Sequence, residues 1–166
     1  LTSLEFWDTL MRFIFDLDMT TVDSSHRQHF VGGVLDLPRW KRDSTPANIM
    51  RDSLLPLARH WRSAFRAGAE IVVCTAREMS EADYEFLRVH GLHYDAILSR
   101  PAGNTQPDGE LKERLIRQYA QTKPETWERF CRFTVMFDDS QNVIKTLAPL
   151  GVRMVESTHI NERLAA

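Results

Sequence analysis

The feature that most constrains the fold is a short, mostly apolar run at residues 12–15 that leads directly into Asp16 and Asp18. Such a run, ended by polar residues, is typical of a buried β-strand. Open α/β sheets bind their ligands beyond the carboxyl ends of the strands, which is where these two acids would lie. Two carboxylates about 4 Å apart repel each other by roughly 4 kcal/mol at an effective dielectric constant near 20. A divalent metal ion usually offsets such repulsion, although solvated acids at an ordinary strand end also fit this stretch.

The remaining chain predicts an α/β fold. Segments with helical periodicity separate four further expected strands, at residues 70–74, 96–98, 133–137 and 152–155. This alternation is typical of a Rossmann-like parallel sheet with helices on both faces. We expect Ser53 to cap a helix with Pro56 in its first turn, and Asp108 to cap another. Residues 156–166 carry no strong signal.

Residues 21–44 predict a small flap. They are rich in polar residues and glycine and show no long helical period, and residues 30–35 fit a short hairpin. Connections of this length are often functional lids. Within the flap, Trp40 stands beside basic residues, a pattern that fits contact with a phosphate or a base. Solvated surface around one packed ring explains the same pattern.

Composition describes an ordinary globular chain. Its 166 residues are 43% hydrophobic and carry a net charge of -2, which does not suggest a broad nucleic-acid-binding surface. Two cysteines make no disulfide framework, and no apolar stretch is long enough to span a membrane, so we expect a cytoplasmic protein. No obligate protein partner is evident. Because Met11 precedes the first strand, residues 1–10 fit an added or upstream segment before a single domain at 11–166. A native extension that packs on the domain is the alternative.

Polar side chains recur at the expected strand ends and at one helix start. Besides the first two acids, they are Thr75, Arg77, Lys112, Asp138 and Asp139. In a parallel sheet these positions share one edge. Carboxylate oxygens suit a hard cation such as Mg2+, and the cationic side chains suit a phosphoryl group. An aspartate can attack phosphorus while a second acid handles protons, so the set contains the parts of metal-assisted phosphate hydrolysis.

Each of these residues alone has an ordinary explanation. The helix dipole stabilises acids at the amino end of a helix. A helical lysine is usually solvated, and a loop arginine usually pairs with a surface acid. A DxDxT pattern, a strand-end threonine, a helical lysine and a strand-end Asp-Asp rarely occur in this order by chance. The combination therefore favours the functional interpretation.

This set resembles the haloacid-dehalogenase-like (HAD) phosphatase superfamily over about residues 12–156. The resemblance implies that Asp16 is the nucleophile and Asp18 the general acid and base. It implies that Thr75 and Lys112 bind phosphoryl oxygens. It also implies that Mg2+ is held by Asp16, the backbone carbonyl of Asp18, and Asp138, with support from Asp139. One departure is Met19, at a position where the family usually has glycine.

A narrower resemblance is to the phosphatase half of phage polynucleotide kinase–phosphatase. It is carried by residues 75–78 and by the loop from Arg100 to Asp108 before Lys112. It implies a phosphorylated polynucleotide end or a nucleotide as substrate, with Arg77 as a phosphate contact and Arg100 as another candidate. His26 and Arg27 follow the first motif and are further candidates for substrate contact. No Gly-x-x-x-x-Gly-Lys-Ser/Thr occurs, so no kinase site is predicted.

Three functions remain open from the sequence. The first is a Mg2+-dependent phosphatase acting on nucleic-acid 3'-phosphates or nucleotides. The second is a 5'-nucleotidase or general small-molecule phosphatase, which the near-neutral charge favours. The third is a non-catalytic binding protein on the same fold, against which the intact acids and lysine argue.

Overall fold

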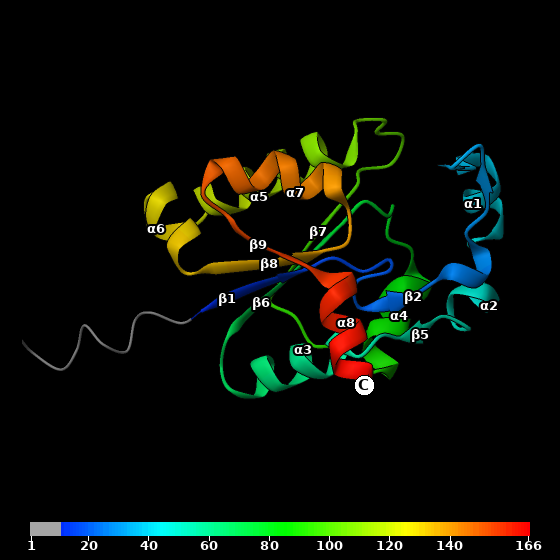
Figure 1. The fold of residues 1–166 in the computed structure, drawn as a ribbon, viewed down its shortest axis with the longest axis horizontal. Helices are drawn as coiled ribbons and strands as arrows, with labels where there is room; N and C mark the ends of the chain where they lie inside the picture. The colour runs from blue at the N-terminus through cyan, green and yellow to red at the C-terminus, as the bar shows by residue number, and fades with distance from the viewer. Residues whose placement is uncertain (1–10) are drawn as a thin grey trace, which may run out of the picture.

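A five-stranded parallel sheet forms the centre of the fold, in the order β7-β6-β1-β8-β9 (Figure 1). The computed structural model describes residues 11–166, so the expectation for residues 1–10 lies outside the described part of the chain. The sheet strands are β1 (Arg12–Phe15), β6 (Glu70–Thr75), β7 (Ala96–Ser99), β8 (Thr134–Asp138) and β9 (Arg153–Glu156). Because β1 is central, its carboxyl end lies between the ends of β6 and β8, as Phe15 pairs with Val73 and Phe137.

Helices cover both faces of the sheet, as predicted (Figure 1). Side chains alternate along β1, so Ile14 and Phe15 belong to different cores. One core packs Phe15 between Trp61 and Phe137, with ring centroids 5.2 and 5.1 Å away. The helices on that side are α3 (Leu57–Arg66), α4 (Glu81–Val89) and α8 (Ser157–Ala165). On the other side lie α5 (Asp108–Gln121), α6 (Trp127–Arg132), α7 (Gln141–Leu147) and the short η2 (Ala148–Leu150).

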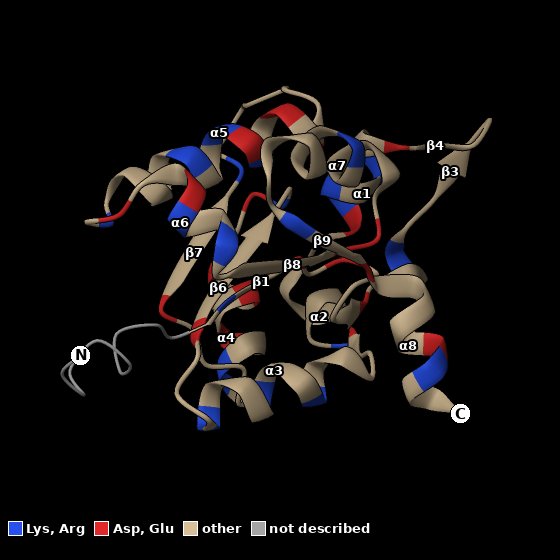
Figure 2. Ribbon diagram, turned by 60° about the vertical axis from the view of Figure 1, so that its left-hand side comes forward, with Lys and Arg blue, Asp and Glu red and all other residues tan. Residues whose placement is uncertain are grey.

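The flap contains more regular structure than the sequence indicated. It comprises β2 (Val22–Asp23), η1 (Ser25–Arg27), the hairpin of β3 (Phe30–Val31) and β4 (Val34–Leu35), and the helix α1 (Leu37–Asp43). The hairpin is confirmed, and Figure 2 shows it extending beyond the rest of the flap. The helix was missed because none of its residues is buried, so it has no apolar stripe. Its start is fixed instead by Asp36, whose carboxylate accepts the Arg39 N–H.

Two expectations about helix caps were wrong, and one helix was not predicted. Ser53 lies in β5 (Ser53–Leu54), which pairs with β2 just after the short α2 (Pro46–Ile49), and α3 begins only after Pro56. Asp108 begins α5 but does not cap it, because its carboxylate accepts from Arg100. The segment without a signal is the helix α8, which Glu156 caps by accepting two backbone N–H groups. None of the described helices has the length and apolar character needed to cross a membrane.

Candidate active site

The acids at the ends of β1 and β8 lie side by side. The Asp16 N–H donates to the Phe137 carbonyl at 3.1 Å, so the pairing of β1 with β8 continues as far as Asp16. Carboxylate oxygens of Asp16, Asp138 and Asp139 lie within 4.8 Å of one another. Asp16 and Asp138 are buried and Asp139 is half-buried. Such a set of oxygen donors fits a hard divalent cation such as Mg2+.

Lys112 reaches the same cluster from α5. Its Nζ lies 2.7 Å from Asp16 Oδ1 and 2.7 Å from Asp138 Oδ2. The start of α5 packs tightly on α7, because Gly109 donates its N–H to Asn142 Oδ1 at 2.9 Å. A side chain at Gly109 would collide with Thr146 and Asn142. This close packing of α5 on α7 places Lys112, near the start of α5, at the strand ends.

The pKa values in the cluster reflect burial and crowded like charge. Burial and the neighbouring Asp138 and Asp139 raise the pKa of Asp16 well above its usual value, although Lys112 opposes this. Burial and Asp138 likewise raise the pKa of Asp139 to about 6. Burial disfavours the charged form of Lys112, but Asp16 and Asp138 outweigh it and raise its pKa. Carboxylates held this closely against their own repulsion are expected where a cation binds.

A tight loop carries the chain from Asp16 to β2. The Leu17 carbonyl accepts the N–H groups of Thr20, Thr21 and Val22, and the Thr21 hydroxyl donates to the Asp16 carbonyl at 2.8 Å. Met19 has a φ of 59°, the left-handed conformation that glycine adopts without strain. Met19 thus adopts the left-handed conformation at the position where the family usually has glycine.

Asp18 faces Arg77, in the loop after β6. The guanidinium donates to Asp18 through Nε at 2.8 Å and through a terminal nitrogen at 2.6 Å. The Ser24 hydroxyl donates to the same carboxylate at 2.5 Å. Burial opposes the charged form of Asp18, but Arg77 outweighs it and lowers the pKa. The remaining donors of Arg77 go to Asp83 at 2.7 Å and Asp52 at 3.3 Å, so these contacts do not support its predicted role as a phosphate contact.

Thr75 ends β6 and is fully buried. Its hydroxyl oxygen accepts the Arg77 N–H at 3.1 Å, and the hydroxyl hydrogen can still donate. Because β6 pairs with β1, Thr75 lies on the strand beside Asp16 at the same edge of the sheet.

The three candidate substrate contacts outside the core motifs are engaged by the protein. Arg27 is buried and binds both carboxylate oxygens of Asp52, and His26 Nε2 lies 2.9 Å from the same side chain. Arg100 binds Ala76, Asn104, Gln106 and Asp108, so its hydrogen bonds stabilise its own loop. These contacts explain the presence of all three residues without a substrate.

Sequence reasoning missed the residues that support the catalytic loop. Asp52 and Asp83, which both contact Arg77, belong to no recognisable catalytic motif. From α8, Asn161 donates to the Thr20 carbonyl at 2.9 Å, and the Ser157 hydroxyl lies 3.0 Å from that of Thr20. No local signal in the sequence could identify these long-range contacts.

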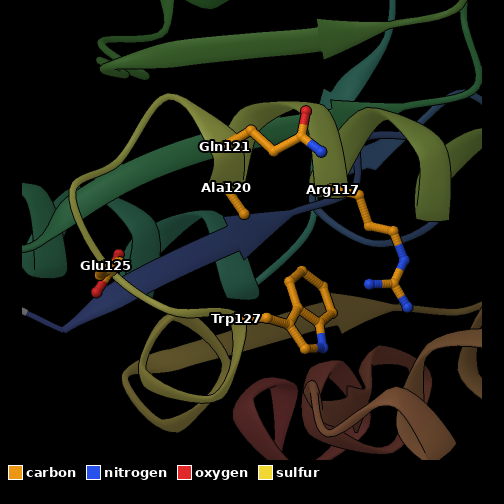
Figure 3. Close-up of a pocket in the computed structure, with 5 residues that line it drawn as sticks. All are labelled: Arg117, Ala120, Gln121, Glu125 and Trp127. Atoms are coloured by element: carbon orange, nitrogen blue, oxygen red, sulfur yellow. The ribbon is translucent and has the colours of Figure 1, made fainter.

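A shallow hollow of about 150 Å³ lies elsewhere (Figure 3). It is lined by Arg117, Ala120, Gln121, Glu125 and Trp127. Glu125 pairs with Arg12, which begins β1, whereas the acidic cluster follows the end of β1. The hollow is therefore at the opposite end of the sheet and is separate from the candidate site.

Comparison with known proteins agrees with this geometry. Residues 8–166 match the family described as bacteriophage T5 5'-deoxynucleotidase. The 5'-deoxynucleotidase of Escherichia phage T5 is 40% identical over 169 residues, which span 92% of this chain and 69% of that protein.

Two solved structures show the same fold. A chain of the Pnkp1/Rnl/Hen1 RNA repair complex has a TM-score of 0.60 at 21% identity, covering 90% of this chain and 43% of its own length. The HAD-like protein SP0104 from Streptococcus pneumoniae has a TM-score of 0.62 at 14% identity, covering 88% and 83%. This chain thus spans less than half of the Pnkp1 complex chain, and both likenesses concern the fold alone. The chain belongs to the bacteriophage T5 5'-deoxynucleotidase family, and it is a phosphatase with a HAD-like fold.

Proposed function

We propose that the protein hydrolyses deoxynucleoside 5'-monophosphates in a Mg2+-dependent reaction through an aspartyl-phosphate at Asp16. The observation that carries this proposal is the buried cluster in which Asp16, Asp138 and Asp139 meet Lys112. This arrangement supports the proposal, because one sheet edge carries side chains suited to act as nucleophile, as cation ligands and as a phosphate-binding charge. Asp18 lies two residues further along the loop.

The metal would be held by Asp16, Asp138 and Asp139, together with the Asp18 carbonyl predicted from the family resemblance. Its chemistry is to neutralise negative charge on the phosphoryl oxygens so that a carboxylate can approach. Lys112 adds a fixed positive charge in the same place, and the Thr75 hydroxyl can donate to a phosphoryl oxygen. Lys112 and Thr75 both interact with negative charge on the phosphoryl oxygens, which is present in the substrate and in the transition state.

In the first step, an Asp16 carboxylate oxygen attacks phosphorus and the bond from phosphorus to the ester oxygen breaks. Asp18 gives a proton to that oxygen, and the nucleoside leaves as a neutral alcohol. This step needs the neutral form of Asp18, whereas Arg77 lowers the pKa of Asp18 and favours the anion, so only the protonated fraction of the enzyme reacts. Asp18 is then an anion, which the Arg77 guanidinium stabilises through two hydrogen bonds.

In the second step, Asp18 takes a proton from water and the oxygen attacks the phosphorus of the aspartyl-phosphate. The bond between phosphorus and the Asp16 oxygen breaks, which releases inorganic phosphate. Asp16 is again a carboxylate and Asp18 is again protonated, so the cycle closes without any other reactant.

The substrate assignment rests on the family and on the contacts within the loop that contains Arg100. The phage T5 relative is named as a 5'-deoxynucleotidase. The loop that resembled a polynucleotide phosphatase contains Arg100, whose donors bind its own loop. Of the substrates left open by the sequence, the mononucleotide therefore has more support than the polynucleotide 3'-phosphate.

A matched substrate panel tests the proposal. Phosphate release is measured with Mg2+ and with EDTA from deoxynucleoside and ribonucleoside 5'-monophosphates, a 3'-mononucleotide, a 3'-phosphorylated oligonucleotide and a sugar phosphate. We expect metal-dependent release with the highest kcat/KM for deoxynucleoside 5'-monophosphates. Preference for the 3'-phosphorylated oligonucleotide would overturn the substrate assignment, and equal release in EDTA would overturn the metal assignment.

A further inference from the structure

Asp52 is a buried carboxylate outside the catalytic motifs. It lies between α2 and β5 in the chain, and its side chain is 0% exposed. One oxygen accepts from His26 Nε2 at 2.9 Å and from Arg27 Nε at 2.9 Å. The other accepts from terminal nitrogens of Arg27 at 2.8 Å and Arg77 at 3.3 Å. A single carboxylate thus joins two buried arginines.

On one side, Asp52 fixes the flap. Arg27, which it holds bidentately, donates to the Ser44 hydroxyl at 2.7 Å. The Arg27 guanidinium also lies 4.1 Å from the ring centroid of Trp40, in α1. The stacking on Trp40 and the Ser44 contact attach α1 to the body, together with the exposed ion pair of Lys41 with Glu78 at 3.1 Å. The buried part of this attachment runs through Arg27, and Arg27 is held by Asp52.

On the other side, Asp52 restrains Arg77. This arginine is 6% exposed and spreads its donors over Asp18, Asp52 and Asp83. Asp83 is itself fixed at the start of α4, where it accepts from the Ser80 N–H and hydroxyl. With Asp52 and Asp83 on two sides, the guanidinium is held in the plane that presents two parallel N–H groups to Asp18.

We propose that Asp52 is a positioning residue that holds Arg77 on Asp18 and connects the flap to the general acid. The inference rests on the proposed function, in which Asp18 protonates the leaving group. Without the Asp52 charge, Arg27 loses its carboxylate partner and becomes an unpaired cation beside Arg77. Arg77 then shifts, and Asp18 no longer points at the leaving oxygen.

The test compares two substrates that differ in their need for a proton. Release of a nucleoside from its 5'-monophosphate requires protonation of an alkoxide, whereas 4-nitrophenyl phosphate releases a phenolate that leaves readily without one. Asp52→Asn, Asp18→Asn and the double variant are assayed on both substrates. The ratio of the two kcat values, taken on one sample, does not depend on how much of a variant is folded. Glu70→Gln is the matched control, because Glu70 pairs with Arg12 at the opposite end of the sheet.

We expect Asp52→Asn to lower the kcat ratio of nucleotide to 4-nitrophenyl phosphate by about tenfold, part of the roughly 100- to 10,000-fold that a positioned general acid contributes. Asp18→Asn should lower the ratio further, and the double variant should match Asp18→Asn. Glu70→Gln should leave it unchanged. If Asp18→Asn lowers the ratio and Asp52→Asn does not, the inference is overturned while the proposed function stands. If Asp18→Asn leaves the ratio unchanged, the general-acid assignment itself fails.

Discussion

Lys112 shows how single residues make this site. Its ammonium lies between two buried carboxylates, 2.7 Å from each, and none of the three charges would be tolerated alone in the interior. The same holds for Arg77 and its three acids. At the residue scale, each buried charge of these clusters is balanced by partners that lie far away in the sequence.

Met19 allows a test of backbone strain in the catalytic loop. Its φ of 59° penalises any residue with a Cβ, so we expect Met19→Gly to be more stable than Met19→Ala by about 1 kcal/mol. Both variants lose the thioether, which makes them a matched pair. Urea unfolding of the two proteins measures the difference, and an alanine variant of equal or greater stability would show that residue 19 is not strained.

Glu70 predicts how part of the stability depends on pH. Burial opposes its charged form, but hydrogen bonds from Lys123 and Tyr119 and the Arg12 charge outweigh it and lower the pKa. A lowered folded-state pKa gives stability that is present above the unfolded value and is lost as pH falls through the folded one. The wild type should therefore exceed Glu70→Gln by about 1 kcal/mol at pH 7, and the difference should be smaller at pH 3, below the usual glutamate pKa. Urea unfolding of both proteins at the two pH values measures the difference in unfolding free energy. A difference that stays constant or grows on acidification would contradict the stabilising role of the charged Glu70.

At the scale of elements, the sequence predicted those parts of the fold that have their own periodicity. The strand at residues 12–15 and the parallel sheet were predicted correctly, because apolar runs bounded by polar residues are local signals. The helices α1 and α8 were missed, since α1 buries nothing and α8 buries only two polar residues, Ser157 and Asn161.

The site shows the same division. The acidic cluster and Lys112 follow from motif order along parallel strand ends. The sequence could not predict the partners of Arg27, Arg77 and Arg100. A charged residue in a loop gives no indication of which distant carboxylate or carbonyl it contacts. Asp52 has no motif of its own and becomes visible only through these contacts.

The helix α8 should support the catalytic loop. Asn161 accepts the Leu57 N–H at 2.8 Å and donates to the Thr20 carbonyl at 2.9 Å, which joins α8 to the start of α3 and to the loop. Asn161→Ala leaves both groups without a partner and should cost about 2–3 kcal/mol of stability. The exposed neighbour Glu162→Ala is the control and should change little. Similar urea midpoints for the two variants would contradict a supporting role for α8.

At the scale of the whole molecule, metal binding should stabilise the folded state. The three carboxylates come from the ends of two strands and converge only on folding, so Mg2+ at about 100 times its Kd should add roughly 2.7 kcal/mol. Asp139→Asn removes one donor and should shrink the increase in Tm. Thermal unfolding across a Mg2+ titration measures both, and a wild-type Tm that does not respond to Mg2+ would contradict the assigned ligands.

The most direct test of the central claim is to trap the intermediate. The enzyme is mixed with Mg2+ and a deoxynucleoside 5'-monophosphate that carries labelled phosphate, quenched in acid within the first turnovers, and the labelled peptide is identified. The account predicts label on the peptide that contains Asp16, at the Asp16 carboxylate, and neither label nor turnover in Asp16→Asn. Label on another residue, or turnover retained in Asp16→Asn, would contradict it.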